Sequence, residues 1–210
     1  ADLENRRVAA MAIRSANVDL QRELIPTFIE LLRHEGDGQI RLAVFDTLTD
    51  LGPQAAAAVP ALANAMRVDF GGRRNEELHQ DYRAALALAS IGSESVECLR
   101  NLLNEQASNL RAESAMALGR IGSAASVAIP DLIKLLGDEQ ERVRIDVIGA
   151  LGAIGSPAVE SLLAAAQNSD DTIRAGAISA LGSAAQGSML REQLLATVFK
   201  ALDDDAPQVR

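Results

Sequence analysis

Apolar residues recur along the chain at the spacing of one face of an α-helix. In the stretch "VRIDVIGALGAIG", Val143, Val147, Leu151 and Ile154 lie at positions i, i+4, i+8 and i+11. Steps of this size keep side chains on one apolar stripe of a helix. We predict a helix of this type, called helix A below, in six similar stretches: 5–17, 40–52, 80–92, 110–122, 143–155 and 173–185.

A second helix, helix B, is predicted after the turn that follows each helix A. Pro60 and Pro130 both lie eight residues after the glycine that ends helix A. Proline fits the first turn of a helix, where no intrahelical N–H is required, and Pro26 occupies the same slot. Helix B is expected over 24–34, 58–67, 128–138, 158–168 and 192–202. The repeats then span approximately 1–37, 38–77, 78–107, 108–140, 141–170 and 171–206, and residues 209–210 begin a seventh.

Glycines recur in helix A although each costs a helix about 1 kcal/mol relative to alanine. One set ends the helix, where a left-handed residue is expected. A second set occupies one earlier register position, and we interpret it as the close approach of a neighbouring helix that a Cβ would block. The terminal set is Gly52, Gly92, Gly122 and Gly155, and the earlier set is Gly119, Gly152 and Gly182.

An arginine near the start of helix A marks the register of the repeats. These arginines are Arg41, Arg111, Arg144, Arg174 and Arg210. Six residues before each stands Glu35, Glu105, Asp138, Asn168 or Asp204. We predict that these residues N-cap the following helix A, and Asp138 with Glu141 has the spacing of a capping box. The third repeat departs from the pattern, with Asn75 and Asp81 in the two slots.

Composition narrows the functional classes. The chain has 210 residues, 2% aromatic residues and no Trp, which favours thin layers of closely packed helices. Its net charge of −9 argues against binding nucleic acid, since affinity for phosphates comes from clustered Lys and Arg. The longest stretch of low charge, 51–66, contains two prolines and is too short to span a bilayer. No membrane association is expected.

The single cysteine, Cys98, cannot form an intrachain disulfide. This permits a reducing compartment, and we expect a cytoplasmic location. Cys98 lies on helix B, and a packed thiol is favoured there over a nucleophile. The first residue, Ala1, is not an initiator Met, so a preceding segment is compatible with the sequence.

The stretch "RAESAMALGRIGSAASVAIPDLIKLLGD" (111–138) resembles HEAT repeats, specifically the bacterial phycobilisome-lyase type (PBS lyase HEAT-like). The resemblance implies an all-α, right-handed superhelix over 1–210, with about six helical hairpins plus the start of a seventh. Helix A would line its convex face and helix B its concave face. It also implies a non-catalytic scaffold for protein contacts. A chromophore lyase or enzyme subunit is the alternative, and a structural spacer within a larger protein is the third hypothesis.

Enzymatic relatives of this fold need residues that are scarce here. HEAT-like deoxyhypusine hydroxylases hold two irons with four His-Glu pairs, whereas His34-Glu35 is the one such pair in this sequence. HEAT-like DNA glycosylases use a basic concave face with Trp. We therefore expect no metal, cofactor or catalytic residue. Because the chain stops where another helix A begins, without a polar end cap, we also expect it to be a fragment.

Two surfaces are candidates for binding a protein partner. Counting along helix B from its apolar pairs gives a row of residues that should point away from the core: Thr27, Glu30, Ala61, Asn64, Cys98, Asn101, Asp131, Lys134, Ser161, Ala164, Thr197 and Lys200.

The other candidate is the insertion 67–80, which places Phe70, Arg73 and Arg74 in a predicted loop. An exposed aromatic beside arginines has the chemistry of a binding anchor, although the same loop is compatible with Phe70 packing on a neighbouring helix. A monomer is expected, apart from contacts at the uncapped ends.

Overall fold

The computed structural model describes residues 3–67, 80–185, 196–197, 199–201, 204–207 and 209. In these residues every regular element is an α-helix or a short 3-10 helix, so the predicted all-α class is confirmed. The chain divides into two compact units, Ala1–Leu99 and Arg100–Arg210.

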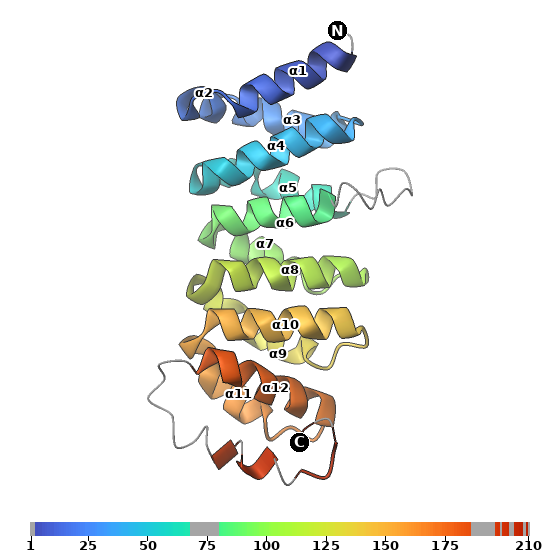
Figure 1. Ribbon diagram of the computed structural model, residues 1–210, viewed down its shortest axis with the longest axis vertical. Coiled ribbons are helices and arrows are strands. Elements are labelled where there is room, and N and C mark those ends of the chain that lie inside the picture. Colours follow the sequence, from blue (N-terminus) through green and yellow to red (C-terminus); the bar gives the residue numbers. More distant parts are fainter. Residues whose placement is uncertain are drawn as a thin grey trace. The chain divides into compact units, whose positions relative to one another are not determined.

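In the first unit, helix A is represented by α1 (Leu3–Arg14), α4 (Gly38–Leu51) and α6 (Gln80–Ile91). These three helices follow one another in one layer of Figure 1, and the helix-B elements lie behind them. The helix-B elements are α3 (Ile25–His34) and α5 (Val59–Arg67). The connections contain α2 (Val18–Glu23), η1 (Gly52–Ala58) and η2 (Ser93–Ser95).

The second unit repeats this arrangement. Helix A is α8 (Ser108–Ile121), α10 (Glu141–Ile154) and α12 (Asp171–Ala184). Helix B is α9 (Ile129–Leu135) and α11 (Val159–Ala165), joined to helix A by η3 (Gly122–Ala128) and η4 (Ser156–Ala158). Helix α7 (Val96–Leu102) crosses the boundary between the units. The described residues 196–197 and 199–201 are helical, inside the helix B predicted for the sixth repeat.

A leucine at one register position of helix A forms the centre of each repeat's core. At most 1% of each is exposed: Leu48, Leu88, Leu118, Leu151 and Leu181. The residue before each leucine is small and also buried: Thr47, Ala87, Ala117, Ala150 and Ala180. Small side chains here let successive A helices pack closely, which explains how the repeats build a core with few aromatic residues.

The ends of the helices follow the predicted turn chemistry. Gly52, Gly92, Gly122 and Gly155 have φ between 53° and 86°. Their ψ values lie between −129° and −141°, a region that is more restrictive than the left-handed helical conformation we predicted. The prolines of α3, α5 and α9 lie in the first turn, as predicted.

The interpretation of the earlier glycines is confirmed at two of three positions. A Cβ on Gly119 would lie 2.8 Å from the Cα of Ala150, and one on Gly152 would lie 2.9 Å from the Cβ of Ser183. A neighbouring helix A therefore approaches closely at both. Gly182 has no such neighbour among the described residues, and neither has Gly149, which faces away from the packed side of α10.

The stretch Ser108–Leu135 is long and apolar enough, by length and composition, to cross a membrane. It consists of α8, η3 and α9, which form one helical hairpin of the second unit. Buried core helices pass the same test of length and composition.

Two glycines inside A helices of the second unit, Gly119 on α8 and Gly149 on α10, provide a test of this packing. Gly119→Ala forces a methyl group against the backbone of α10, and we expect a loss of about 1–2 kcal/mol in the free energy of unfolding, after the gain in helix propensity. Gly149→Ala adds its methyl group to open space and should stabilise by about 0.5–1 kcal/mol. Urea denaturation followed by circular dichroism measures both. Equal effects at the two positions would contradict the packing account.

Candidate protein-binding surface

The register arginine of each described pair donates hydrogen bonds to the backbone of the loop that precedes its own helix A. One guanidinium nitrogen of Arg111 donates to the carbonyl oxygens of Glu105 and Gln106, at 2.9 and 2.8 Å. Arg144 and Arg174 make the same pair of bonds to the carbonyls six and five residues before them. At these three steps, the loop from helix B to the next helix A has two backbone carbonyls bound by the arginine.

The remaining nitrogens of the same arginine reach forward to the next loop. Arg111 binds both carboxylate oxygens of Asp138, at 2.7 and 2.9 Å, and Arg174 binds Asp204 at 3.0 and 2.8 Å. Paired bonds of this kind are geometrically specific. For Arg144, the arginine between these two, the corresponding residue in the next loop is Asn168, an amide that carries no charge to pair with an arginine.

In the first unit, arginines make related contacts with different partners. Arg6 pairs with Glu35 at 2.7 Å, and Arg7 binds both oxygens of Asp37. Arg41 is 1% exposed, donates to the carbonyl of Leu32 at 2.8 Å and lies over the ring of Phe45. Burial lowers the pKa of Arg41 to about 10, although the nearby charge of Glu35 opposes this effect. The guanidinium therefore stays charged at neutral pH.

Our prediction that the residue six positions before the arginine caps helix A is wrong. The N-cap lies two residues later, at Asp37, Ala107, Gln140 or Asp170. The Asp138 side chain instead accepts the backbone N–H of Gln140 at 2.9 Å, so Asp138 and Glu141 form no capping box. Asn168 and Asp204 accept from the residue two positions on in the same way.

The row of residues on helix B is largely exposed, as predicted. Glu30, Asn64, Asn101, Lys134 and Lys200 are all exposed, while Asp131 and Thr197 are half-buried. Ala61 departs from the prediction: it is 6% exposed and packs in the core of the first unit. Most B helices therefore present at least one long polar side chain on this side, whereas α11 presents the small residues Ser161 and Ala164.

Ion pairs organise part of this surface. Arg100 on α7 binds Asp131 on α9, with both guanidinium contacts at 2.9 Å. The Lys134 ammonium lies 3.6 Å from the other oxygen of Asp131, and its side chain is 77% exposed. Asp131 is thus shared by two cations, Arg100 and Lys134.

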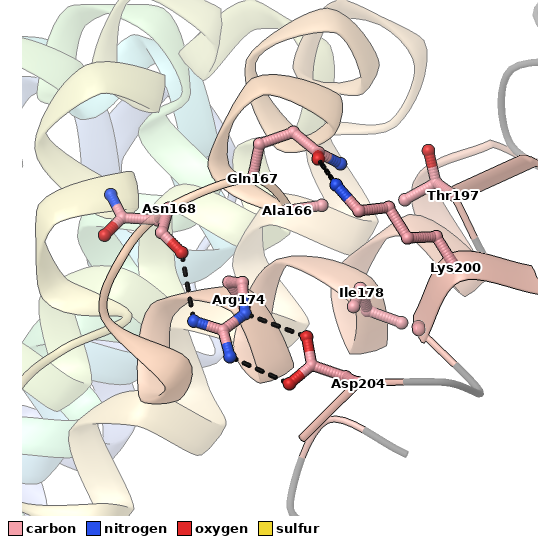
Figure 2. A pocket seen from close by; sticks show the side chains of 9 residues that line it. Ala166, Gln167, Asn168, Arg174, Ile178, Thr197, Lys200 and Asp204 are labelled. Atoms are coloured by element: carbon pink, nitrogen blue, oxygen red, sulfur yellow. Dashed lines mark hydrogen bonds and ion pairs between the residues drawn. The ribbon is translucent and has the colours of Figure 1, made fainter. Parts of the chain in front are cut away.

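A pocket of about 220 Å³ opens in the second unit beside this row. Figure 2 shows Gln167 and Lys200 meeting at its rim, where the lysine donates to the amide oxygen of Gln167, and the Arg174–Asp204 pair inside it. A pocket of about 310 Å³ in the first unit lies against the corresponding part of α3. Its lining residues are Arg6, Thr27, Glu30, Leu31, His34 and Glu35.

The other residues considered in the sequence analysis are Cys98, the histidines and the residues of the insertion 67–80. Burial raises the pKa of the Cys98 thiol, against a weaker opposing effect of Arg67, so this half-buried cysteine is a poor nucleophile. His34 ends α3 and lies 3.4 Å from Glu30. No group of three or more His, Cys, Asp or Glu in the described ranges is arranged to hold a metal ion. Phe70, Arg73 and Arg74 lie outside the described residues.

Two families match the part of the chain that contains these hairpins. Residues 125–182 match HEAT repeats, and residues 110–138 match the PBS lyase HEAT-like repeat. The chain is a HEAT-repeat protein. The HEAT-repeat hairpins α8–α9 and α10–α11 carry four residues of the helix-B row: Asp131, Lys134, Ser161 and Ala164. None of the curated proteins matches the sequence.

Several solved structures are similar to this HEAT-repeat chain. An engineered protein is 21% identical, with a TM-score of 0.46 over 88% of this chain and 91% of its own. A second engineered protein is 20% identical, with a TM-score of 0.39 over 98% and 71%. An archaeal HEAT-like repeats protein from Thermococcus onnurineus NA1 is 15% identical, with a TM-score of 0.45 over 98% and 92%.

Asp138, the carboxylate that Arg111 binds in the next loop, should make the free energy of unfolding depend on pH. Burial tends to raise the pKa of Asp138, but the bonds from Arg111 and the Gln140 N–H and the charges of Arg111 and Arg144 outweigh it, so the pKa is lowered. A lowered folded-state pKa stabilises the fold fully above the unfolded value near ~4 and loses this contribution as pH falls through the folded value. Asp138→Asn should lower the free energy of unfolding by about 1–3 kcal/mol at pH 7. When this free energy is measured by urea denaturation at several pH values, the variant should also lose less stability than the unmodified chain as the pH falls.

Two variants check this interpretation. Glu30→Gln removes an exposed partner of Arg33 and should change stability by less than about 0.5 kcal/mol. Asn168→Asp supplies a carboxylate at the step that lacks one and should stabilise by about 0.5–1 kcal/mol. If Asp138→Asn is as mild as Glu30→Gln, the forward ion pair does not hold the repeats together.

Proposed function

We propose that this HEAT-repeat protein is a non-catalytic scaffold that binds a protein or peptide on the exposed face of helix B. The observation that carries the proposal is an exposed polar residue at the same outward position of most B helices: Glu30 and Asn64 in the first unit, and Asn101, Lys134 and Lys200 in the second. Within each unit, polar residues that recur on one side of helix B fit an extended or helical partner, which presents its own side chains at regular intervals.

Helix B has one buried side and one exposed side, and this arrangement supports the proposal. Leu62, Leu99, Leu132 and Leu162 are fully buried, so one side of each helix holds the fold while the other remains open. The open side lacks Trp and Tyr anchors, which carry much of the energy in tight interfaces. We therefore expect weak to moderate affinity, with the 67–80 segment contributing more than any single residue of helix B.

Chromophore lyase activity is the competing hypothesis, since residues 110–138 match the PBS lyase HEAT-like repeat. The match concerns the repeat, and unrelated functions share one fold. Incubation of the chain with bilins, followed by absorbance, distinguishes the two: a spectral shift with covalent transfer to an acceptor protein would support the lyase.

Partner capture with paired variants tests the scaffold proposal. The full chain is immobilised, and proteins retained from a lysate of the source organism are identified by mass spectrometry. Asn101→Ala/Lys134→Ala should reduce retention of the specific partner about tenfold, because both side chains lie on the exposed row. Glu139→Ala/Ile145→Ala, which removes two exposed side chains outside that row, is the matched control and should leave retention unchanged.

The triple variant Phe70→Ala/Arg73→Ala/Arg74→Ala decides where the main anchor lies. Loss of binding in the triple variant and a smaller loss in the helix-B pair would agree with an anchor in the insertion. Loss in the helix-B pair alone would assign the anchor to helix B. If neither variant matters, helix A carries the function and the proposal is wrong.

A further inference from the structure

The pocket in Figure 2 is built by three consecutive parts of the second unit. Gln167 and Asn168 follow α11, Arg174 lies in the first turns of α12, and Thr197, Lys200 and Asp204 come from the sixth repeat and the loop after it. The pocket thus lies at the edge of the helix-B row, where successive repeats meet.

The charges in this pocket do not cancel. Asp204 is occupied by two bonds from Arg174, and both side chains are 19% exposed. Lys200 donates to Gln167, which is a neutral amide, and has no carboxylate in ion-pair contact within the described part of the chain. Among the residues that line the pocket, Lys200 therefore adds one positive charge that the Arg174–Asp204 pair does not balance, in a chain whose net charge is −9.

The size of the pocket limits its occupant. The volume of the pocket is about 220 Å³. It lies below the ~300–1,000 Å³ of sites for drug-sized ligands and cofactors. One side chain of a partner fits this space, whereas a tetrapyrrole does not.

We infer that this pocket receives an acidic side chain of the bound partner, with Lys200 as its charge partner and the amides of Gln167 and Asn168 as neutral hydrogen-bond donors. The inference rests on the proposed scaffold function and names the chemistry of its partner: an extended segment that presents a glutamate or aspartate at the sixth repeat. A carboxylate can displace the Gln167 oxygen from the ammonium group, because a charged acceptor binds more strongly than an amide.

The first unit contains a pocket of the same construction with the opposite charge. It too has an arginine–carboxylate pair, Arg6–Glu35, beside the end of helix B, but Glu30 occupies the place that Lys200 has in the sixth repeat. The repeat architecture therefore does not itself impose a preference for acids. The preference follows from Lys200, and Glu30 marks a site where an acidic group would be repelled.

The lysine content of the chain makes the test direct. Lys134 and Lys200 are its two lysines, so few amines compete for coupling. A short, terminally blocked peptide with one central glutamate is incubated with the full chain and a water-soluble carbodiimide, which joins a bound carboxylate to a nearby amine as an amide. Peptide mapping by mass spectrometry then locates the adduct. Fluorescence anisotropy of the same peptide gives its affinity without coupling.

The expected adduct is on Lys200, several-fold in excess over Lys134 and the N-terminal amine. Lys200→Gln should weaken binding of the glutamate peptide about tenfold, and raising the salt concentration should weaken it further. Arg120→Gln, which removes an exposed cation of α8 outside the helix-B row, is the matched control and should change affinity less than about twofold. Replacing the peptide's glutamate with glutamine should reproduce the effect of Lys200→Gln.

Three results would overturn the inference: equal coupling to all amines, equal binding of glutamate, glutamine and lysine peptides, or unchanged affinity in Lys200→Gln. Equal binding of all three peptides, with loss in Asn101→Ala/Lys134→Ala, would leave the scaffold function standing and remove the acidic preference alone. Absence of peptide binding together with failed partner capture would reject both proposals.

Discussion

The described repeats depend on the hydrogen bonds and ion pairs that the arginine near the start of helix A makes with the loops on either side. In Arg111 and Arg174 one guanidinium group satisfies two carbonyls of the loop before its helix and binds a carboxylate in the loop after the next helix B. Arginine suits this role because its planar group offers five donors in a fixed arrangement, which lysine does not. The Arg111 and Asp138 side chains are only 11% and 5% exposed, which makes this pair sensitive to removal of either partner.

Because these arginine contacts lie in the loops, the packing of the repeats does not require particular side chains on most of the exposed side of helix B. The apolar side of helix B and the small residues of helix A supply the packing, and the arginines set the register between repeats. Side chains on the open side can then vary in charge from repeat to repeat, as Glu30 and Lys200 do in pockets of the same construction. Such variation within a constant frame is what a binding scaffold requires for specificity.

The sequence predicted the helices and their packing better than it predicted the polar contacts. Periodic stripes located helix A and helix B, and the glycine register anticipated the approach of Ala150 to Gly119. The role of Asp138 was missed, because a carboxylate near a helix start fits a local cap equally well and its partner, Arg111, lies 27 residues earlier. Ala61 was placed on the exposed row because small residues fit either side of a helix. The pocket beside Lys200 depends on three separate segments, so no local pattern indicates it.

Site-specific photo-crosslinking tests the central claim, that the open side of helix B receives the partner. A benzophenone side chain at Asn101 on α7 is compared with one at Ile145, which is 59% exposed on α10, in the presence of the captured partner. We expect a covalent complex from position 101 and none from position 145. A complex from position 145 alone would place the partner on helix A and contradict the account.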